Sequence, residues 1–285
     1  MLKSMVRKLA NKTGYDFVRK PDPYRLDLYR QIFSEEVLRR RPFYNIGAGT
    51  FSHPYWTSVD FDTEWYGKDR DIVHYDLMKL EPLPIEGASA KIIYSSHTVE
   101  HVSDDAVQNL CNEAFRCLEP GGLLRITTGP DAETDYRAML AGDEDWFYWS
   151  KNYNLPGTYE HLFKVPAMSV PIEERWLHHV ASQLAPHSHD DHKKVTASEI
   201  RELAAKMSME EVLDYLTGQV SFDPKRPGNH MSWWTHAKLE KFIRNAGFTT
   251  VYRSGYGQSA SPLMRQSPLF DSTHPQISIY VEAVR

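Results

Sequence analysis

Apolar runs and amphipathic stretches alternate along the first 130 residues and return at the end of the chain. Each predicted strand is a short apolar run between turn residues. The strands run from Pro42 to a glycine turn at 47–49, then over 56–60, 71–77, 90–97, 123–128, 248–253 and 276–284. Helical spacing predicts helices over 24–41, over 103–118 with Ser103 as N-cap and a stop at 119–122, and over 233–246.

This alternation of strands and helices predicts an α/β fold, with a mostly parallel sheet that carries helices on both faces. Between residues 131 and 230 the alternation disappears, and helical pieces are predicted at 131–141, 172–184 and 197–217. We therefore divide the chain into an N-terminal segment, a first part of the core, a mainly helical insertion and a second part of the core. Their bounds are 1–41, 42–130, 131–230 and 231–285. The insertion is expected to cap the carboxyl ends of the strands and to form an acceptor site.

Composition narrows the class of protein. The chain has 285 residues and a net charge of -5, and a general nucleic-acid binder would need a broad basic surface. Its two cysteines, Cys111 and Cys117, lie in one predicted helix and cannot form a disulfide framework, which fits a reducing cytosol. We find neither an apolar run that would cross a bilayer nor the apolar core of a signal peptide. The expected location is therefore the cytoplasm.

Residues 1–20 are basic against the acidic total, with apolar residues at roughly helical spacing. A basic amphipathic segment of this kind can rest weakly on an anionic membrane surface. The alternative is a solvated helix that packs loosely on the domain.

The turn with Gly47 and Gly49 follows the first predicted strand, and Asp60 ends the second. Glycine lets a ligand approach the backbone closely, because it has no side chain to block it. A carboxylate such as Asp60 can accept hydrogen bonds from both hydroxyls of a ribose. This combination suggests a nucleotide-like ligand at the edge of the sheet.

Five segments in order make this suggestion specific. They are Asn45-Ile46-Gly47-Ala48-Gly49, Asp60, Asp76-Leu77, Ser96-His97-Thr98-Val99-Glu100-His101 and Leu118-Glu119-Pro120-Gly121-Gly122. With them the chain resembles the class I S-adenosylmethionine-dependent methyltransferases, over 42–130 and over 231–285. The resemblance implies a seven-stranded Rossmann-like sheet, S-adenosylmethionine as cofactor and methyl transfer as the reaction.

The resemblance also implies roles for single residues. The glycine turn would approach the methionine end of the donor, Asp60 the ribose, and Asp76 with the Leu77 amide the adenine. Asp62 lies close enough to compete with Asp60. Ser96 and His97 would face the methionine and methyl ends. The implied cofactor-binding residues are Asn45, Gly47, Ala48, Gly49, Asp60, Asp76, Leu77, Ser96 and His97.

The chain departs from the family pattern after Gly49. Phe51 replaces the third glycine of the motif, and Pro54 interrupts a connection too short for the usual crossover helix. This shortened form is similar to predicted methyltransferases found with surface-polysaccharide genes, as is the leader at 14–19. That second resemblance implies a small-molecule or glycan acceptor, methylated at a sugar hydroxyl.

Two other functions stay open on the sequence. A nicotinamide-dependent sugar-nucleotide enzyme would carry a third glycine at position 52, where this chain has Ser52, and an acid about 20 residues on, whereas Asp60 comes sooner. The other alternative is a partner subunit that binds the donor without catalysis.

Methylation of a hydroxyl is helped by a base, and histidine is the usual one because its pKa lies near working pH. Ligand sites in such sheets lie beyond the carboxyl ends of the strands. Four residues fit this position: His97 and His101 after the fourth strand, Asp131 after the fifth, and His230 where the insertion rejoins the core. His97 and His230 rank first, since the pair Glu100-His101 can instead brace the next helix.

Two further groups stand out in the insertion and next to it. The histidines 178, 179, 187, 189 and 192 are closely spaced, but the spacing matches no metal motif, and no metal is predicted. The aromatic residues Trp146, Phe147, Tyr148, Trp149, Trp233 and Trp234 suit either a sugar ring or internal packing.

Overall fold

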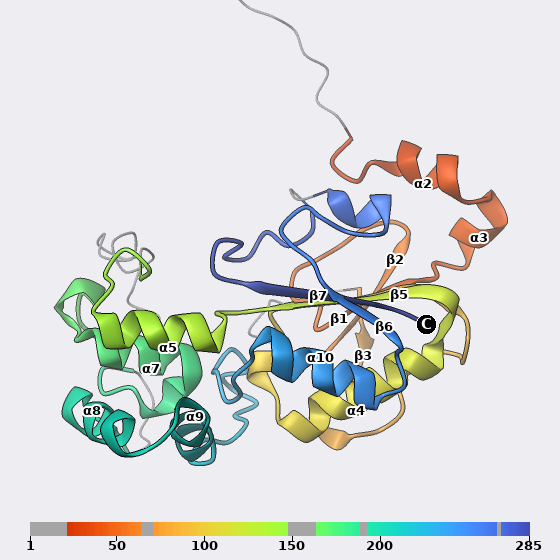
Figure 1. Ribbon diagram of the computed structural model, residues 1–285. Coiled ribbons are helices and arrows are strands. Elements are labelled where there is room, and N and C mark those ends of the chain that lie inside the picture. Colours follow the sequence, from red (N-terminus) through yellow and green to blue (C-terminus); the bar gives the residue numbers. More distant parts are fainter. Residues whose placement is uncertain (1–21, 64–70, 148–163, 189–192, 267–268) are drawn as a thin grey trace, which may run out of the picture.

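The computed structural model describes residues 22–63, 71–147, 164–188, 193–266 and 269–285 (Figure 1). Within them the strands form one seven-stranded sheet in the order β3-β2-β1-β4-β5-β7-β6. Neighbours from β3 to β5 are parallel, and β7 is antiparallel to both β5 and β6. The strands are β1 Phe43–Ile46, β2 Trp56–Asp60, β3 Val73–His74, β4 Ala90–Ser96, β5 Leu118–Thr128, β6 Thr250–Arg253 and β7 Ile279–Val284. The predicted mostly parallel sheet is confirmed.

Helices α4 (Asp104–Cys117) and α10 (His236–Asn245) pack side by side on one face of the sheet (Figure 1). Ser103 is the N-cap of α4 and accepts a hydrogen bond from the Ala106 amide, as predicted. Buried Leu110 and Cys111 of α4 and Leu239 of α10 join the main core beneath the sheet. The two helices and the central strands thus share one continuous apolar core on this face of the sheet.

The predicted end of α4, at residue 118, was off by one residue, whereas the predicted start of the fifth strand, at residue 123, was wrong by five. The helix ends at Cys117, and β5 starts at Leu118, upstream of the proline and glycines that were read as the helix stop. Leu118 is buried and pairs with Ala90 of β4, and the amide of Gly121 donates to the Arg285 carbonyl at 2.8 Å. Pairing with two neighbouring segments therefore draws these residues into the sheet, against their local turn preference.

Three of the predicted helices are divided or shortened by internal caps. The segment 24–41 forms α2 (Leu26–Ile32) and α3 (Glu35–Arg39), because Ser34 caps a new helix. The segment 197–217 forms α8 (Ala197–Lys206) and α9 (Met209–Thr217), where Ser208 makes a capping box with Glu211. Helix α7 (Ile172–Val180) gives way to the 3-10 helix Ser182–Leu184. Strand β3 is likewise shorter than predicted, because Asp76 caps the 3-10 helix Leu77–Lys79.

Helices α5 (Ala132–Ala141), α7, α8 and α9 form a helical group beside the sheet, starting where β5 ends (Figure 1). They pack around a separate apolar cluster that contains Met139, Trp176 and Leu213. The buried carboxylate of Asp135 on α5 contacts His179 Nδ1 of α7 at 3.2 Å and accepts from Trp146 Nε1 at 2.8 Å. Among the described residues no helix combines the length and the apolar character needed to cross a membrane.

The connection between β1 and β2 contains no helix, as the sequence predicted. An aromatic cluster fills the space instead: Trp56 is fully buried, and its Nε1 donates to the Tyr29 hydroxyl of α2 at 2.6 Å. Phe51 packs against Trp56 and Phe270, and His53 is held by the Tyr24 carbonyl. The face that a crossover helix would cover is thus covered by α2 and by residues from the connection between β6 and β7.

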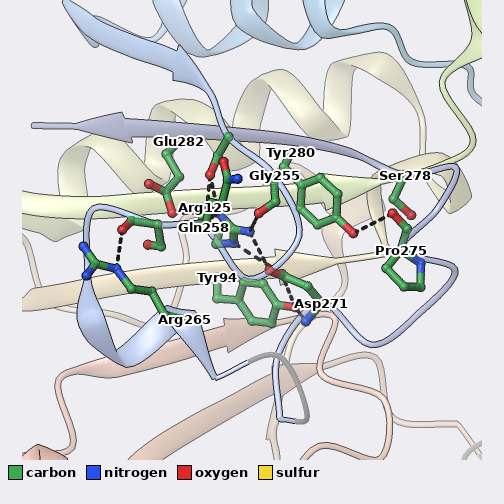
Figure 2. Close-up of polar contacts among 12 residues, drawn as sticks. Tyr94, Arg125, Gly255, Gln258, Arg265, Asp271, Pro275, Ser278, Tyr280 and Glu282 are labelled. Carbon is green, nitrogen blue, oxygen red and sulfur yellow. Dashed lines mark hydrogen bonds and ion pairs between the residues drawn. The ribbon is translucent and has the colours of Figure 1, made fainter.

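That connection, residues 254–278, is held to the sheet by the fully buried Arg125 of β5 (Figure 2). Its guanidinium lies 2.5 Å from an Asp271 oxygen and 2.7 Å from a Glu282 oxygen, and donates to the carbonyls of Gly255 and Gln258. Two carboxylates and two carbonyls satisfy the buried cation, so the connection takes one defined path over the sheet.

Candidate functional site

Two adjoining hollows lie beyond the carboxyl ends of β1, β2 and β4, and they share Gly47, His97 and His101. The first hollow is mainly apolar, lined among others by Ile46, Val59, Phe61, Tyr75, Leu77, Met78 and Val102, with the carboxylates Asp60 and Asp76. The second hollow is more polar and has a volume of about 590 Å³. Its lining includes Asn45, Thr50, Ser52, Ser96, Asp271, Ser272 and Thr273. All nine predicted cofactor-binding residues line one of the two hollows or both.

The glycine turn takes its shape from its neighbours. Gly47 and Gly49 both have left-handed φ angles, +70° and +55°. A Cβ on Gly47 would lie 2.2 Å from Oγ1 of Thr98, so no other residue fits while Thr98 packs there. Position 47 thus requires glycine because Thr98 packs against it, a constraint that the sequence did not suggest.

Asp60 joins the end of β2 to this turn. Its Oδ2 accepts from the Gly49 amide at 2.9 Å, and its Oδ1 accepts from the Phe61 amide at 2.8 Å. The competitor Asp62 is exposed and lines neither hollow. Of these two acids, Asp60 is therefore the one that presents a carboxylate to the first hollow.

Asp76 and Leu77 follow β3, which is separated from β1 by β2 in the sheet, and both line the first hollow. Asp76 caps its 3-10 helix through a hydrogen bond from the Met78 amide at 3.0 Å. This cap holds the carboxylate and the Leu77 amide at the edge of the apolar lining, an arrangement that suits a flat base with polar edges.

Asn45 offers a specific contact in the second hollow. The residue is only 4% exposed, and its Oδ1 lacks a hydrogen-bond partner among the described residues. A buried amide oxygen without a partner is costly, so a ligand that donates a hydrogen bond here would be stabilised. The ammonium group of S-adenosylmethionine is such a donor. Asn45 in the second hollow and the carboxylates of Asp60 and Asp76 in the first therefore fit this cofactor.

His97 stands where the two hollows meet. Its backbone is left-handed, with φ +48°, which turns the ring between two partners. Nδ1 lies 2.9 Å from Oε1 of Glu100, and Nε2 lies 2.9 Å from the Ser278 hydroxyl. Because a carboxylate only accepts, the proton of the neutral ring is on Nδ1 and the lone pair is on Nε2. His97 is thus oriented like a general base.

Glu100 is 2% exposed and lies among histidines. Its Oε2 accepts from the Thr128 hydroxyl at 2.7 Å. Burial disfavours ionisation, but the neighbouring His97, His101 and His230 outweigh it and lower the pKa of Glu100 to about 2. The carboxylate is therefore an anion at neutral pH and holds the ring of His97 in place.

His101 and His230 lie against each other, with ring centroids 4.8 Å apart. His101 lines both hollows, whereas His230 lines neither. Desolvation by the surrounding protein, with help from His101, lowers the pKa of His230 to about 3. Asp131, the fourth predicted base, is the N-cap of α5, accepts from Glu133 and Thr134, and lines neither hollow. The structure thus brings His97 and His101 to the hollows, and keeps His230 and Asp131 outside them.

Several site residues were missed in the sequence. Ser278 and Asp271 come from the connection between β6 and β7, more than 170 residues from His97, and no local pattern marks them. Glu100 was seen only as a brace, although an acid between two histidines directly after a predicted strand was a usable signal.

The histidine and aromatic groups of the insertion take structural positions where they are described. His179 pairs with Asp135, and His187 lies 3.6 Å from Glu174, so these two histidines do not converge. His189 and His192 lie outside the described residues, as do Tyr148, Trp149 and the basic segment 1–20. The aromatic side chains of Phe147, Trp233 and Trp234 are buried, which favours packing.

Residues 54–126, which span β2 to β5, match a family model described as "Methyltransferase domain". The sheet has the seven strands that the resemblance to class I enzymes implies, and its order, with β7 antiparallel between β5 and β6, is typical of the methyltransferase Rossmann-like fold. The chain is a class I S-adenosylmethionine-dependent methyltransferase. Its cofactor is S-adenosylmethionine, which decides against the nicotinamide alternative.

Solved structures similar to this methyltransferase are distant. One is a complex between the Haloferax volcanii Trm112 methyltransferase activator and the putative methyltransferase, 12% identical, covering 91% of each chain, with a TM-score of 0.38. Another is an S-adenosylmethionine-dependent methyltransferase from Archaeoglobus fulgidus, 11% identical, covering 92% of this chain and 100% of that one, with a TM-score of 0.38. A possible histamine N-methyltransferase from Thermotoga maritima is 13% identical, covers 91% and 95%, and has a TM-score of 0.37. No curated protein matches the chain in sequence. Nothing about the acceptor follows from likenesses this remote.

Proposed function

We propose that this methyltransferase methylates a hydroxyl group of a sugar, carried by a small molecule or a glycan precursor, with His97 as the base. The observation that carries the proposal is the position of His97, which lines both hollows and is oriented by a buried carboxylate. The choice of a sugar acceptor extends the expectation drawn from the sequence of the shortened β1–β2 connection.

The two hollows suit different parts of the donor. The apolar first hollow, with carboxylates at its edges, would hold the adenosine through Asp60 at the ribose and Asp76 at the adenine. Asn45 and the glycine turn would hold the methionine end in the second hollow. When bound, S-adenosylmethionine supplies an electrophilic methyl group.

The second hollow also offers room and polarity for the acceptor. Its volume of about 590 Å³ falls within the range of small-molecule sites. Hydroxyl side chains such as Thr50, Ser52 and Ser272 line it, and they can exchange hydrogen bonds with a molecule that carries several hydroxyls. This lining favours a sugar over an apolar acceptor.

His97, supported by Glu100, accepts the proton that the acceptor hydroxyl loses. Nε2 of His97 takes the proton as the hydroxyl oxygen becomes a nucleophile, and the Glu100 carboxylate at 2.9 Å from Nδ1 stabilises the resulting imidazolium. In the described structure the Ser278 hydroxyl lies 2.9 Å from Nε2, so the hydroxyl of the acceptor would take the place of this contact. His230 lines neither hollow and is not needed in this role.

Calorimetry with S-adenosylhomocysteine and transfer of labelled methyl to nucleotide sugars and glycan oligomers test the proposal. Asp60→Ala should lower affinity for S-adenosylhomocysteine at least about 10-fold, since it removes hydrogen bonds to a charged acceptor. Asp62→Ala is the matched control and should bind like the wild type. Equal affinities in the two variants would refute the ribose role of Asp60.

His97→Asn is the sharper test of the base, because asparagine tolerates the left-handed backbone better than alanine. We expect kcat to fall at least about 100-fold while S-adenosylhomocysteine still binds. Full turnover in this variant would remove His97 from the mechanism. Methylation of amines or carboxylates, with none of any sugar, would overturn the acceptor class.

A further inference from the structure

Three side chains next to the hollows converge, and only Glu100 among them has a part in the proposed reaction. Glu100, His101 and His230 each offer a ligand atom, and these atoms all lie within 4.8 Å of one another. Two come from the 3-10 helix Val99–His101 after β4, and the third comes from the segment that leads into α10. Two imidazoles with one carboxylate form a ligand set that suits a divalent transition metal.

The proton positions of both histidines favour metal binding. Nδ1 of His101 lies 3.2 Å from the Asn229 carbonyl, and Nδ1 of His230 lies 2.5 Å from the His179 carbonyl. A carbonyl oxygen only accepts, so in each neutral ring the proton is on Nδ1 and the lone pair is on Nε2. Metal-binding histidines are held in this way, with one nitrogen donating to a carbonyl or carboxylate and the other facing the metal.

The carboxylate of Glu100 is also held in position by its neighbours. Glu100 is nearly inaccessible, and Thr128 fixes its Oε2 with a hydrogen bond of 2.7 Å. Its Oε1 contacts His97 Nδ1, but a carboxylate oxygen has two lone pairs and can serve a ring N–H and a metal at once. The group thus has one fixed orientation.

The backbone around the cluster is tied on both sides. The amides of Met231 and Ser232 donate to the Glu100 carbonyl at 2.9 and 3.2 Å, and the His230 amide donates to the Ser182 hydroxyl at 2.9 Å. These bonds hold His230 beside the 3-10 helix without a metal. A site preorganised in this way loses little conformational entropy when it binds an ion.

We propose that Glu100, His101 and His230 bind a divalent transition metal ion of the zinc class. Three protein ligands leave a tetrahedral ion a further position for water or another ligand. Because His101 also lines both hollows, the ion would brace the wall that they share. The site does not depend on the identity of the acceptor, and metal binding is measured without any methyl transfer.

The test uses the full chain, stripped with a chelator and titrated with Co²⁺ and then with Zn²⁺. We expect one Co²⁺ per chain with the visible bands of a tetrahedral site, displaced by Zn²⁺. Glu100→Gln and His230→Ala should weaken the metal affinity at least about 100-fold. His236→Ala, a half-buried histidine on α10 outside the cluster, should bind like the wild type.

Circular dichroism in the chelator shows whether each variant is folded, and the wild-type titration decides the question even if a variant is not. Absence of Co²⁺ and Zn²⁺ binding by the stripped wild type would overturn the proposal. The same holds if folded Glu100→Gln binds as tightly as the wild type. Loss of binding in His187→Ala, with none in Glu100→Gln, would place the metal elsewhere and equally overturn it.

Discussion

The two hollows that meet at His97 differ in how far apart in the chain their residues lie. The first is built almost entirely from residues 46–102, with Phe222 and Pro227 added from the helical part. The second needs Leu269, Asp271, Ser272 and Thr273 from the connection between β6 and β7. The first hollow, which the proposal assigns to the adenosine, therefore follows from consecutive strand ends, whereas the second hollow depends on a remote connection that Arg125 holds in place.

Asp271→Ala tests whether the connection between β6 and β7 depends on Arg125. Among the predicted changes it should have the largest effect, a loss of stability. It leaves the buried Arg125 with one carboxylate instead of two and removes a partner of the Tyr94 hydroxyl. Breaking a buried pair from one side costs about 3–5 kcal/mol. We expect a loss of this size in the free energy of unfolding in urea, while the protein that stays folded keeps its affinity for S-adenosylhomocysteine.

Glu240→Ala is the matched control, since its pair with Arg253 is partly exposed, with 63% of the Arg253 and 23% of the Glu240 side chain accessible. The expected cost is below about 1 kcal/mol. If the two variants lose the same stability, the Arg125 cluster does not hold the connection as described. If Asp271→Ala instead loses donor affinity while folded, the two hollows are not separable.

Gly47→Ala tests the glycine turn after β1, and we expect it to cause an intermediate loss of stability. It combines a left-handed φ of +70° with a Cβ only 2.2 Å from Thr98 Oγ1. Backbone strain alone costs about 1–3 kcal/mol. Gly142→Ala is the control for that part, because its φ is +66° and nothing lies within 4 Å of an added Cβ. Unfolding should show a larger loss at 47 than at 142, and the excess should shrink when Thr98→Ala is added. An unchanged excess would contradict the role of Thr98.

Ser278→Ala tests the contact between His97 and the connection that precedes β7. Among the predicted changes it should have the smallest effect, a modest loss of kcat. The variant removes a neutral hydrogen bond to His97 Nε2, worth about 0.5–1.5 kcal/mol. We expect kcat to fall about 2- to 10-fold, with the donor affinity unchanged in calorimetry. A loss as large as that of His97→Asn would mean that Ser278 itself takes part in proton transfer.

Much of the donor side could be predicted because its residues directly follow strand ends. Asp60, Asp76 and His97 each stand where an apolar run stops, and parallel strands bring such ends to one edge. The choice between Asp60 and Asp62 needed the structure, since β2 ends at Asp60 and Asp62 lies in the exposed loop after it. Helix ends were less predictable: Ser34 and Ser208 cap new helices inside stretches whose apolar spacing looked continuous.

The sequence by itself determined the α/β class, the abbreviated connection after Gly49, the methyltransferase pattern and the acids of the donor side. These follow from local periodicity, turn chemistry and residues near strand ends, which act over a few positions. Only the tertiary structure decided that Ser278 reaches His97, that Asp271 reaches the second hollow, and that His230 joins Glu100 and His101. Those contacts join segments separated by up to about 180 residues, and the physical reason is that packing and buried charge, not sequence spacing, bring them together.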